Sequence, residues 1–264
     1  MTYETLTIDQ QKKGVAWIRI DNAPANAIDD ALMQDLNQAA DELAKDDKVR
    51  VVVLASDNEK TFLAGLDLKN AMGSDSEDSD GENPITKESK RLQACFQKFA
   101  EMPKPVIAAI NGYALGGGCE LALACDFRIM GAGKIGLTEV SLGLIPGAGG
   151  TQRLTKLLGR AKATELIFKA KRIDAKEALD IGLIHEQTEA ENLESKVTAF
   201  AEELAEGAVK AMGIAKKAMN AADQPLEEGL DVEAHAFAET FNTEEPGIGL
   251  AAFFQKETPQ FLNE

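Results

Sequence analysis

The stretch VIAAINGYALGGGCELALA, residues 106–124, indicates more about the fold than any other part of the chain. Its first five residues, 106–110, form an unbroken apolar run of the kind that makes a strand buried on both faces. Three glycines follow at 116–118, and residues 119–124 can begin a helix directly after them. The stretch therefore predicts a buried strand, a glycine-lined loop and a helix in immediate succession.

The three glycines have two physical explanations. Bare glycines at a helix N-terminus leave backbone N–H groups approachable, and such a terminus favours an anion or a developing oxyanion. Glycines also allow a helix to pack closely on a sheet, with no role in binding. The motif by itself favours neither explanation, so both remain open at this point.

Elsewhere in the first half of the chain, strands alternate with helices. Residues 15–20 and 49–54 form apolar runs that predict buried strands. Apolar residues at helical spacing indicate a helix between them, capped by Asp29 or Asp30. A further helix is predicted over residues 86–100. This alternation predicts an α/β fold with a largely parallel sheet.

A second strand-to-loop unit precedes the glycine-rich one. The strand at 51–55 leads through a polar turn to FLAGLDLK, residues 62–69. If this strand lies parallel to the strand at 106–110, both following loops emerge at the same edge of the sheet. Two backbone N–H groups could then converge on one carbonyl oxygen. That geometry is an oxyanion hole, which suits the carbonyl of a thioester.

Two acidic residues lie near this predicted hole. Glu120 ends the glycine-rich motif, and Glu139 lies in the apolar, glycine-rich segment 136–147. Two carboxyl groups around one water can differ in protonation, so that one acts as an acid while the other holds or deprotonates the water. Either residue could equally be an acid at the surface or at a helix cap. Spacing alone does not establish catalysis.

The composition excludes several classes of partner. The chain has 264 residues, with 28 Lys and Arg against 44 Asp and Glu, and a formal charge of −16. Nucleic-acid binding is not expected, because it needs clustered Lys and Arg. The chain contains no apolar run of 18 uncharged residues, and Glu4 and Asp9 do not fit a signal peptide, so no membrane partner is expected. Three cysteines without a C-x-x-C pair favour a cytoplasmic location.

Three further patterns are interpreted as structural. His185 and His235 offer no metal-ligand spacing, so no metal site is expected. The segment GAGKIG at 131–136 matches a dinucleotide-binding pattern by letter, but no acid follows it at the required distance, and turn glycines are predicted instead. The acidic run at 74–83 does not fit a calcium loop, because a loop with Gly81 in sixth place would have Lys87 as its last ligand. A solvated loop is predicted at 74–83 instead.

Taken together, these motifs resemble the crotonase superfamily, and within it the enoyl-CoA hydratases. The segment AGLDLK at 64–69 is similar to the AGADIK segment of that family, and the segments at 111–120 and 145–154 match its motifs almost letter for letter. The resemblance implies a spiral of repeated ββα units over residues 1–200. It also implies a helical C-terminal section, residues 201–264, that forms homotrimers, or homohexamers when two trimers stack.

The resemblance further implies a set of site residues. The backbone N–H groups of Leu66 and Gly117 would form the oxyanion hole, and coenzyme A would run past Ala25, Ala27, Ala64, Asp67, Leu68 and Lys69. Glu120 would position and activate a water, and Glu139 would transfer the proton. The expected reaction is the hydration of a 2-trans-enoyl-CoA in fatty-acid β-oxidation. No cofactor is expected beyond the coenzyme A of the substrate.

The chain departs from the family pattern at three places. Thr138 stands where proline commonly precedes the second glutamate, the turn at 131–136 is one residue shorter, and Leu66 replaces a small residue beside the acyl pocket. The alternatives are an enoyl-CoA isomerase, a hydratase for branched acyl groups, and an inactive paralogue that binds CoA.

Overall fold

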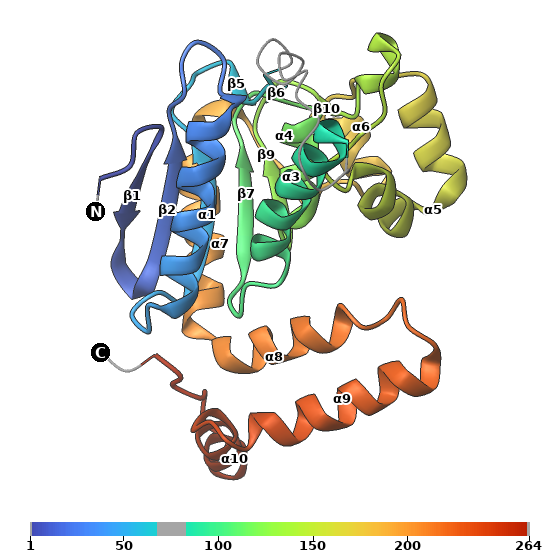
Figure 1. Ribbon diagram of the computed structural model, residues 1–264. Coiled ribbons are helices and arrows are strands. Elements are labelled where there is room, and N and C mark those ends of the chain that lie inside the picture. The colour runs from blue at the N-terminus through green and yellow to red at the C-terminus, as the bar shows by residue number, and fades with distance from the viewer. Residues whose placement is uncertain (1, 68–82, 263–264) are drawn as a thin grey trace.

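Six strands form the main sheet of the computed structural model, which describes residues 2–67 and 83–262 (Figure 1). Within these residues the strand order is β1 (Leu6–Gln10), β2 (Val15–Ile20), β4 (Val51–Ser56), β7 (Val106–Ile110), β9 (Phe127–Met130) and β11 (Glu186–Gln187). β1 and β2 are antiparallel, and the other neighbouring pairs are parallel. The predicted parallel sheet is therefore confirmed.

Short strands follow the long ones and form two small parallel sheets. They are β3 (Ala27–Ile28) paired with β6 (Gly65–Leu66), and β8 (Tyr113–Leu115) between β5 (Thr61–Leu63) and β10 (Ile135–Gly136). Each turn of the chain then runs from a long strand through a short strand to a helix, as in β7, β8 and α4. The spiral of ββα units that the resemblance implied is present.

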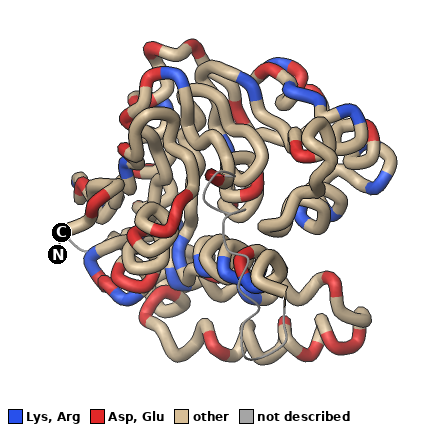
Figure 2. The backbone as a smooth tube through the Cα atoms, turned by 45° about the horizontal axis from the view of Figure 1, so that its top comes forward, with Lys and Arg blue, Asp and Glu red and all other residues tan. Residues whose placement is uncertain are grey.

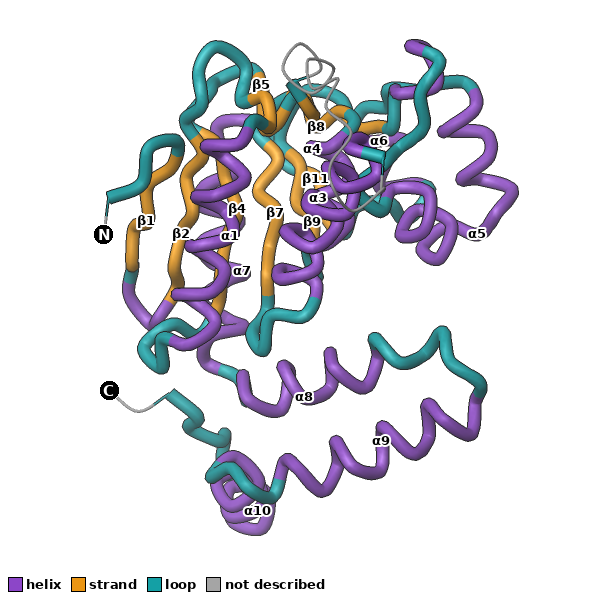
Figure 3. Tube along the Cα trace, viewed as in Figure 1, coloured by secondary structure: helices purple, strands orange, loops and turns teal. Residues whose placement is uncertain are grey.

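Helices cover both faces of the main sheet (Figure 3). The helices of the described residues are α1 (Asp30–Lys45), α3 (Pro84–Ala100), α4 (Gly117–Ala124), α5 (Gly150–Phe168), α6 (Ala175–Asp180), α7 (Leu193–Glu206), α8 (Val209–Met219), α9 (Leu226–Thr240) and α10 (Glu245–Gln255), with the short 3₁₀ turns η1 (Lys12–Gly14), η2 (Glu139–Leu142) and η3 (Ala190–Asn192). None of these helices is long and apolar enough to cross a membrane.

Alternation along the strands divides the core into two layers. Val52 and Leu54 of β4 point into the larger layer with α1 and α3, whereas Val51 and Val53 face α7. β4 and β7 carry no charged residue, whereas Figure 2 shows Lys, Arg, Asp and Glu spread over many other parts of the backbone. Strands buried on both faces read as continuous apolar runs, which is why the sequence identified them.

Side-chain caps fix the helix starts. The side chain of Asp29 accepts a hydrogen bond from the Leu32 N–H at 2.9 Å and caps α1. Helix α3 begins at Pro84, two residues before the predicted start, because Asn83 caps it through the Ile85 N–H at 2.8 Å. Proline suits the first position of a helix, because an N–H at that position would have no partner within the helix.

The C-terminal helices α8, α9 and α10 lie below the sheet in Figure 1. Helix α7 precedes them and packs on the sheet, with Val197 and Ala201 buried against β4 and β7. Position 200, where the sequence analysis ends the core, lies inside α7. The division into residues 1–200 and 201–264 therefore stays a prediction. The predicted loop at 74–83 lies outside the described residues, apart from Asn83.

A buried ion pair joins α8 to the core. Lys216 has a side chain only 7% exposed, and its Nζ donates to Asp126 Oδ2 at 2.8 Å and to the Phe99 carbonyl at 3.0 Å. The same Asp126 oxygen accepts the Val106 N–H at 2.8 Å, at the start of β7. Burial raises the pKa of Asp126, while Lys216 opposes this shift. Removal of the lysine would leave a largely buried carboxylate without its cation.

We predict that Lys216→Met lowers the free energy of unfolding by about 2–4 kcal/mol, because the Asp126 carboxylate loses its buried partner. The matched control is Lys217→Met, which removes only an exposed pair with Glu239, and its cost should stay below about 1 kcal/mol. Urea unfolding of both variants at one protein concentration measures the difference. Equal losses in the two variants would contradict the assigned role of Lys216.

Candidate active site

Two loops meet at one edge of the sheet, as the strand pattern predicts. β4 and β7 are parallel neighbours, with Leu54 opposite Ala108. The loops that follow them approach so closely that a Cβ added at Gly65 would lie 3.3 Å from the Gly117 nitrogen. A Cβ added at Gly117 would lie 3.6 Å from the Leu66 nitrogen. The two N–H groups expected to form an oxyanion hole therefore lie close together, on segments far apart in the sequence.

Individual glycines of the triplet serve different needs. A side chain at Gly118 would overlap the Leu63 carbonyl, so this glycine is required for close packing of α4 on β5. Gly117 is the first residue of α4, and the N–H groups of a first turn have no carbonyl partner within the helix. Both explanations offered by the sequence thus have a structural basis, at neighbouring residues.

Glu120 lies in the first turn of α4 and is only 3% exposed. Its Oε1 accepts hydrogen bonds from the backbone N–H groups of Ala148 and Gly150, both at 2.8 Å. Gly150 is the first residue of α5, so the carboxylate also lies at the positive end of a helix dipole. Burial raises the pKa of Glu120, and the two N–H groups counteract part of that shift because they stabilise the charged form.

Glu139 begins the short turn η2 and has a different environment. A Cβ added at Gly116 would lie 3.3 Å from Glu139 Oε1, so this carboxyl group reaches the glycine-rich loop despite Thr138 and the shorter turn before it. Its Oε2 is buried and makes no hydrogen bond to the described residues. Burial, and then the charge of Glu120, raise the pKa of Glu139 to about 7. The two carboxyl groups therefore differ in how they are solvated and held.

Arg153 is a neighbour of this pair to which the sequence analysis assigned no role. Its Nη1 donates to the Ala148 carbonyl at 3.0 Å, and its Nη2 donates to Gln97 Oε1 at 2.7 Å. Its charge lowers the pKa of Glu120, after the two backbone N–H groups. The sequence signal for Arg153 was its place one turn into a helix that follows a glycine-rich loop. Basic residues in such places are too common to indicate a site.

Four of the six residues expected to bind coenzyme A lie along two paired segments. Ala27 of β3 lies opposite Gly65 of β6, and the N–H groups of Ala64 and Asp67 donate to the carbonyls of Asn26 and Ile28. This pairing places Ala25 and Ala27 beside Ala64 and Asp67, and all four are at least partly exposed. Leu68 and Lys69, the other two, lie outside the described residues.

Asn26 holds this surface in place and was also missed. It is fully buried, with φ of 52°, a left-handed conformation that asparagine tolerates better than most residues. Its Nδ2 donates to Ser56 Oγ at 2.7 Å and to the Phe62 carbonyl at 3.2 Å. These bonds tie the loop at 22–26 to β4 and β5.

The remaining motifs have structural roles. The segment at 131–136 joins β9 to β10 and opens no helix, and Gly133 adopts a φ of 78°, as turn glycines do. Within residues 2–67 and 83–262, no cluster of three His, Cys, Asp or Glu side chains could hold a metal ion. Cys95, Cys119 and Cys125 are all free and buried.

Comparison with known proteins identifies the family of this chain. Residues 10–264 match the enoyl-CoA hydratase/isomerase family. The chain is 37% identical to a probable enoyl-CoA hydratase of Mycobacterium bovis, over 100% of both chains. The chain belongs to the enoyl-CoA hydratase/isomerase family.

Two further proteins are similar to this family member over nearly its whole length. It is 36% identical to a methylglutaconyl-CoA hydratase of Rattus norvegicus, over 97% of this chain and 82% of the relative. A crystal structure of an enoyl-CoA hydratase from Bacillus anthracis is 37% identical, with a TM-score of 0.88 over 99% of this chain and 100% of that chain. Full-length similarity to enoyl-CoA hydratases shows that this enoyl-CoA hydratase/isomerase family member is an enzyme.

We predict that Glu139→Gln stabilises this family member more at pH 8 than at pH 5. The pKa of Glu139 rises from 4.5 to about 7 on folding, so the folded protein binds more protons than the unfolded chain between these values. Stability is therefore lost as the pH rises through this window, and an uncharged glutamine avoids the loss. The gain at pH 8 should be about 1–3 kcal/mol.

Urea unfolding of the variant and the wild type at the two pH values measures this difference. Glu59→Gln, at an exposed position between β4 and β5, is the matched control and should change the pH dependence little. A stability difference for Glu139→Gln that is the same at pH 5 and pH 8 would contradict the raised pKa.

Proposed function

We propose that the protein adds water to the double bond of a 2-trans-enoyl-CoA, giving a 3-hydroxyacyl-CoA, in fatty-acid β-oxidation. The observation that carries the proposal is the placement of Glu120 and Glu139 around the loop that holds the Gly117 N–H. A hydration needs a polarised carbonyl, a held water and a proton donor. These three requirements fit one pair of N–H groups and two carboxyl groups of unequal protonation.

The proposed reaction starts at the thioester carbonyl. The N–H groups of Leu66 and Gly117 polarise this oxygen, so that C3 becomes electrophilic and the charge that develops on the oxygen is stabilised. Water bound by Glu120 and Glu139 attacks C3 and gives one proton to the Glu120 carboxylate. Protonated Glu139 gives its proton to C2. The product gains one OH and one H, and proton exchange between the carboxyl groups restores the starting state.

The environments of the two acids support this division of roles. Glu139, with a pKa of about 7, holds a proton over a useful part of the neutral range, as a general acid must. Glu120 accepts two backbone N–H bonds, and such bonds favour the ionised form that a base requires. We therefore propose Glu139 as the proton donor and Glu120 as the residue that activates water.

The reaction as proposed needs no cofactor or metal. Addition of water is neither a net oxidation nor a net reduction of the substrate. The two N–H groups polarise the carbonyl as a Lewis acid would. The partner is then the acyl-CoA substrate alone, which we propose runs past Ala25, Ala27, Ala64, Asp67 and the undescribed Leu68 and Lys69. Three free, buried cysteines support our proposal of a cytoplasmic location.

A branched-acyl hydratase is the second candidate. The relative from Rattus norvegicus is named a methylglutaconyl-CoA hydratase, and the partly exposed Leu66 has its backbone nitrogen beside Gly117 of the glycine-rich loop. A leucine there changes the shape available to the acyl group without affecting the backbone N–H. Initial rates with straight C4 to C16 and with branched 2-enoyl-CoA substrates decide between the two candidates.

We predict that Glu120→Gln and Glu139→Gln each lower the rate of crotonyl-CoA hydration at least about a hundredfold, because each removes a proton-transfer group. Loss of absorbance at the enoyl-thioester band measures the rate, and Glu59→Gln serves as the control. An isomerase needs only one base, so near-full hydration by either variant would contradict the two-carboxyl proposal. A wild type no faster than buffer would favour an inactive paralogue.

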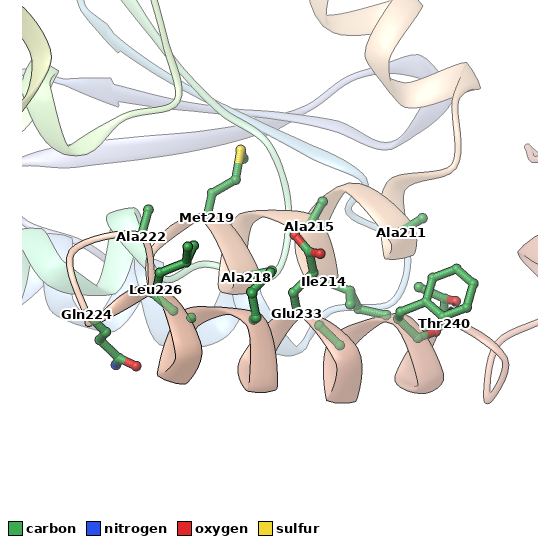
Figure 4. A pocket seen from close by; sticks show the side chains of 15 residues that line it. Ala211, Ile214, Ala215, Ala218, Met219, Ala222, Gln224, Leu226, Glu233 and Thr240 are labelled. Carbon is green, nitrogen blue, oxygen red and sulfur yellow. Dashed lines mark hydrogen bonds between the residues drawn. The ribbon is translucent and has the colours of Figure 1, made fainter.

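We also propose that α8, α9 and α10 join copies of this chain into a homotrimer or homohexamer. Figure 4 shows a groove between α8 and α9, with apolar side chains that include Ile214, Ala218, Met219 and Leu226. An exposed apolar stripe on α9 and its C-cap consists of Leu226, Leu230, Phe237 and Phe241. An apolar surface that extends over two helices is typical of an interface between protein chains.

We predict that light scattering gives three or six times the 28.3 kDa mass of one chain, and that Phe237→Asp reduces it, because a charge would be buried in the interface. Phe168→Asp, at an exposed position at the end of α5, should leave the wild-type mass unchanged. A wild type of single-chain mass would contradict the proposal.

A further inference from the structure

One face of α3 carries three polar residues that point toward the loop before α5. Ser89, Gln93 and Gln97 follow one another at intervals of four residues and therefore share one side of the helix. Ser89 Oγ donates to the Gly147 carbonyl at 2.6 Å, and Gln93 Nε2 donates to the same oxygen at 2.8 Å. Gln93 Nε2 also donates to Ser89 Oγ at 3.2 Å, which links the two side chains.

The Gly147 carbonyl shares a peptide group with the N–H of Ala148. That N–H donates to Glu120 Oε1 at 2.8 Å. The two α3 side chains and Glu120 therefore bind opposite ends of one planar peptide unit. Hydrogen bonds in such a chain polarise one another, so donors at the carbonyl strengthen the bond made by the N–H.

The next peptide group is held in the same way. Arg153 Nη1 donates to the Ala148 carbonyl at 3.0 Å, and Gln97 Oε1 accepts from Arg153 Nη2 at 2.7 Å. Two consecutive carbonyls of the loop are thus fixed by α3, directly in one case and through Arg153 in the other. The peptide that carries the Ala148 N–H has little freedom to rotate away from Glu120.

We propose that Ser89 and Gln93 are positioning residues for Glu120, acting through the Gly147–Ala148 peptide. Neither side chain touches the reacting atoms. Their role is to fix the N–H that orients the Glu120 carboxylate and keeps it charged. The proposal rests on the proposed function, because it assigns Glu120 the task of accepting a proton from water.

The test compares the double variant Ser89→Ala/Gln93→Leu with two others. Gln34→Leu makes the same glutamine substitution at an exposed position on α1, and Ser89→Thr keeps the hydroxyl donor. We expect the double variant to lose about three- to tenfold in kcat, because a weakened bond to a charged group costs a fraction of its full value. KM should change less than about twofold, since the CoA surface is untouched.

The pH profile separates positioning from a general structural defect. A weaker Ala148 bond raises the pKa of Glu120, so the acidic limb of kcat should move to higher pH in the double variant. Gln34→Leu and Ser89→Thr should keep the wild-type limb. A double variant with the wild-type kcat and the wild-type acidic limb of the pH profile would overturn the proposal. A loss of kcat with a matching rise in KM and no shift of the acidic limb would also overturn it.

A second measurement keeps this test independent of the proposed function. Carbon-13 NMR of protein labelled at the glutamate carboxyl groups, with Glu120 assigned by its absence in Glu120→Gln, reports the pKa of that residue directly. A higher pKa of Glu120 in the double variant supports the proposal, and an unchanged one overturns it. If the wild type lacks hydratase activity, the proposed function fails while this result still decides the role of Ser89 and Gln93.

Discussion

The approach of two backbone segments, at Gly65 and Gly117, is the constraint on which the site depends. Each glycine lies where a Cβ would press on the other segment, at 3.3 Å from the Gly117 nitrogen in one case and from the Gly65 Cα in the other. The parallel pairing of β4 with β7 brings these loops to the same edge of the sheet. Any side chain at this crossing would separate the Leu66 and Gly117 N–H groups. This separation would remove the paired donors that can stabilise an oxyanion.

The crossing also determines how the acids are placed. Helix α4 begins at Gly117 and carries Glu120 into the interior, where the start of α5 supplies its partners. Glu139 reaches the same loop from η2, and its buried Oε2 has no hydrogen-bond partner among the described residues. One carboxyl group is thus held by the backbone, and the other is left for water or substrate. A raised pKa at Glu139 costs stability at neutral pH, a cost that is common where groups are arranged for reaction.

Much of the fold could be predicted from the sequence, because buried parallel strands are continuous apolar runs. The predicted strands at 15–20 and 106–110 coincide with β2 and β7, and of the two caps that the sequence allowed, Asp29 is the one that caps α1. Glu120, Glu139, Leu66 and Gly117 came from motifs and resemblance, and their roles remain proposals. The roles of Asn26, Arg153, Ser89 and Gln93 were missed because their side chains bond groups 30 to 58 residues away or across a loop, and no periodicity records such contacts.

The fate of isotopes from the solvent shows whether this site hydrates its substrate. When crotonyl-CoA reacts in water labelled with oxygen-18 and deuterium, we expect one oxygen-18 in the C3 hydroxyl group and one deuterium at C2, as measured by mass spectrometry and NMR. Deuterium at C4 without incorporation of oxygen would contradict hydration and indicate movement of the double bond instead.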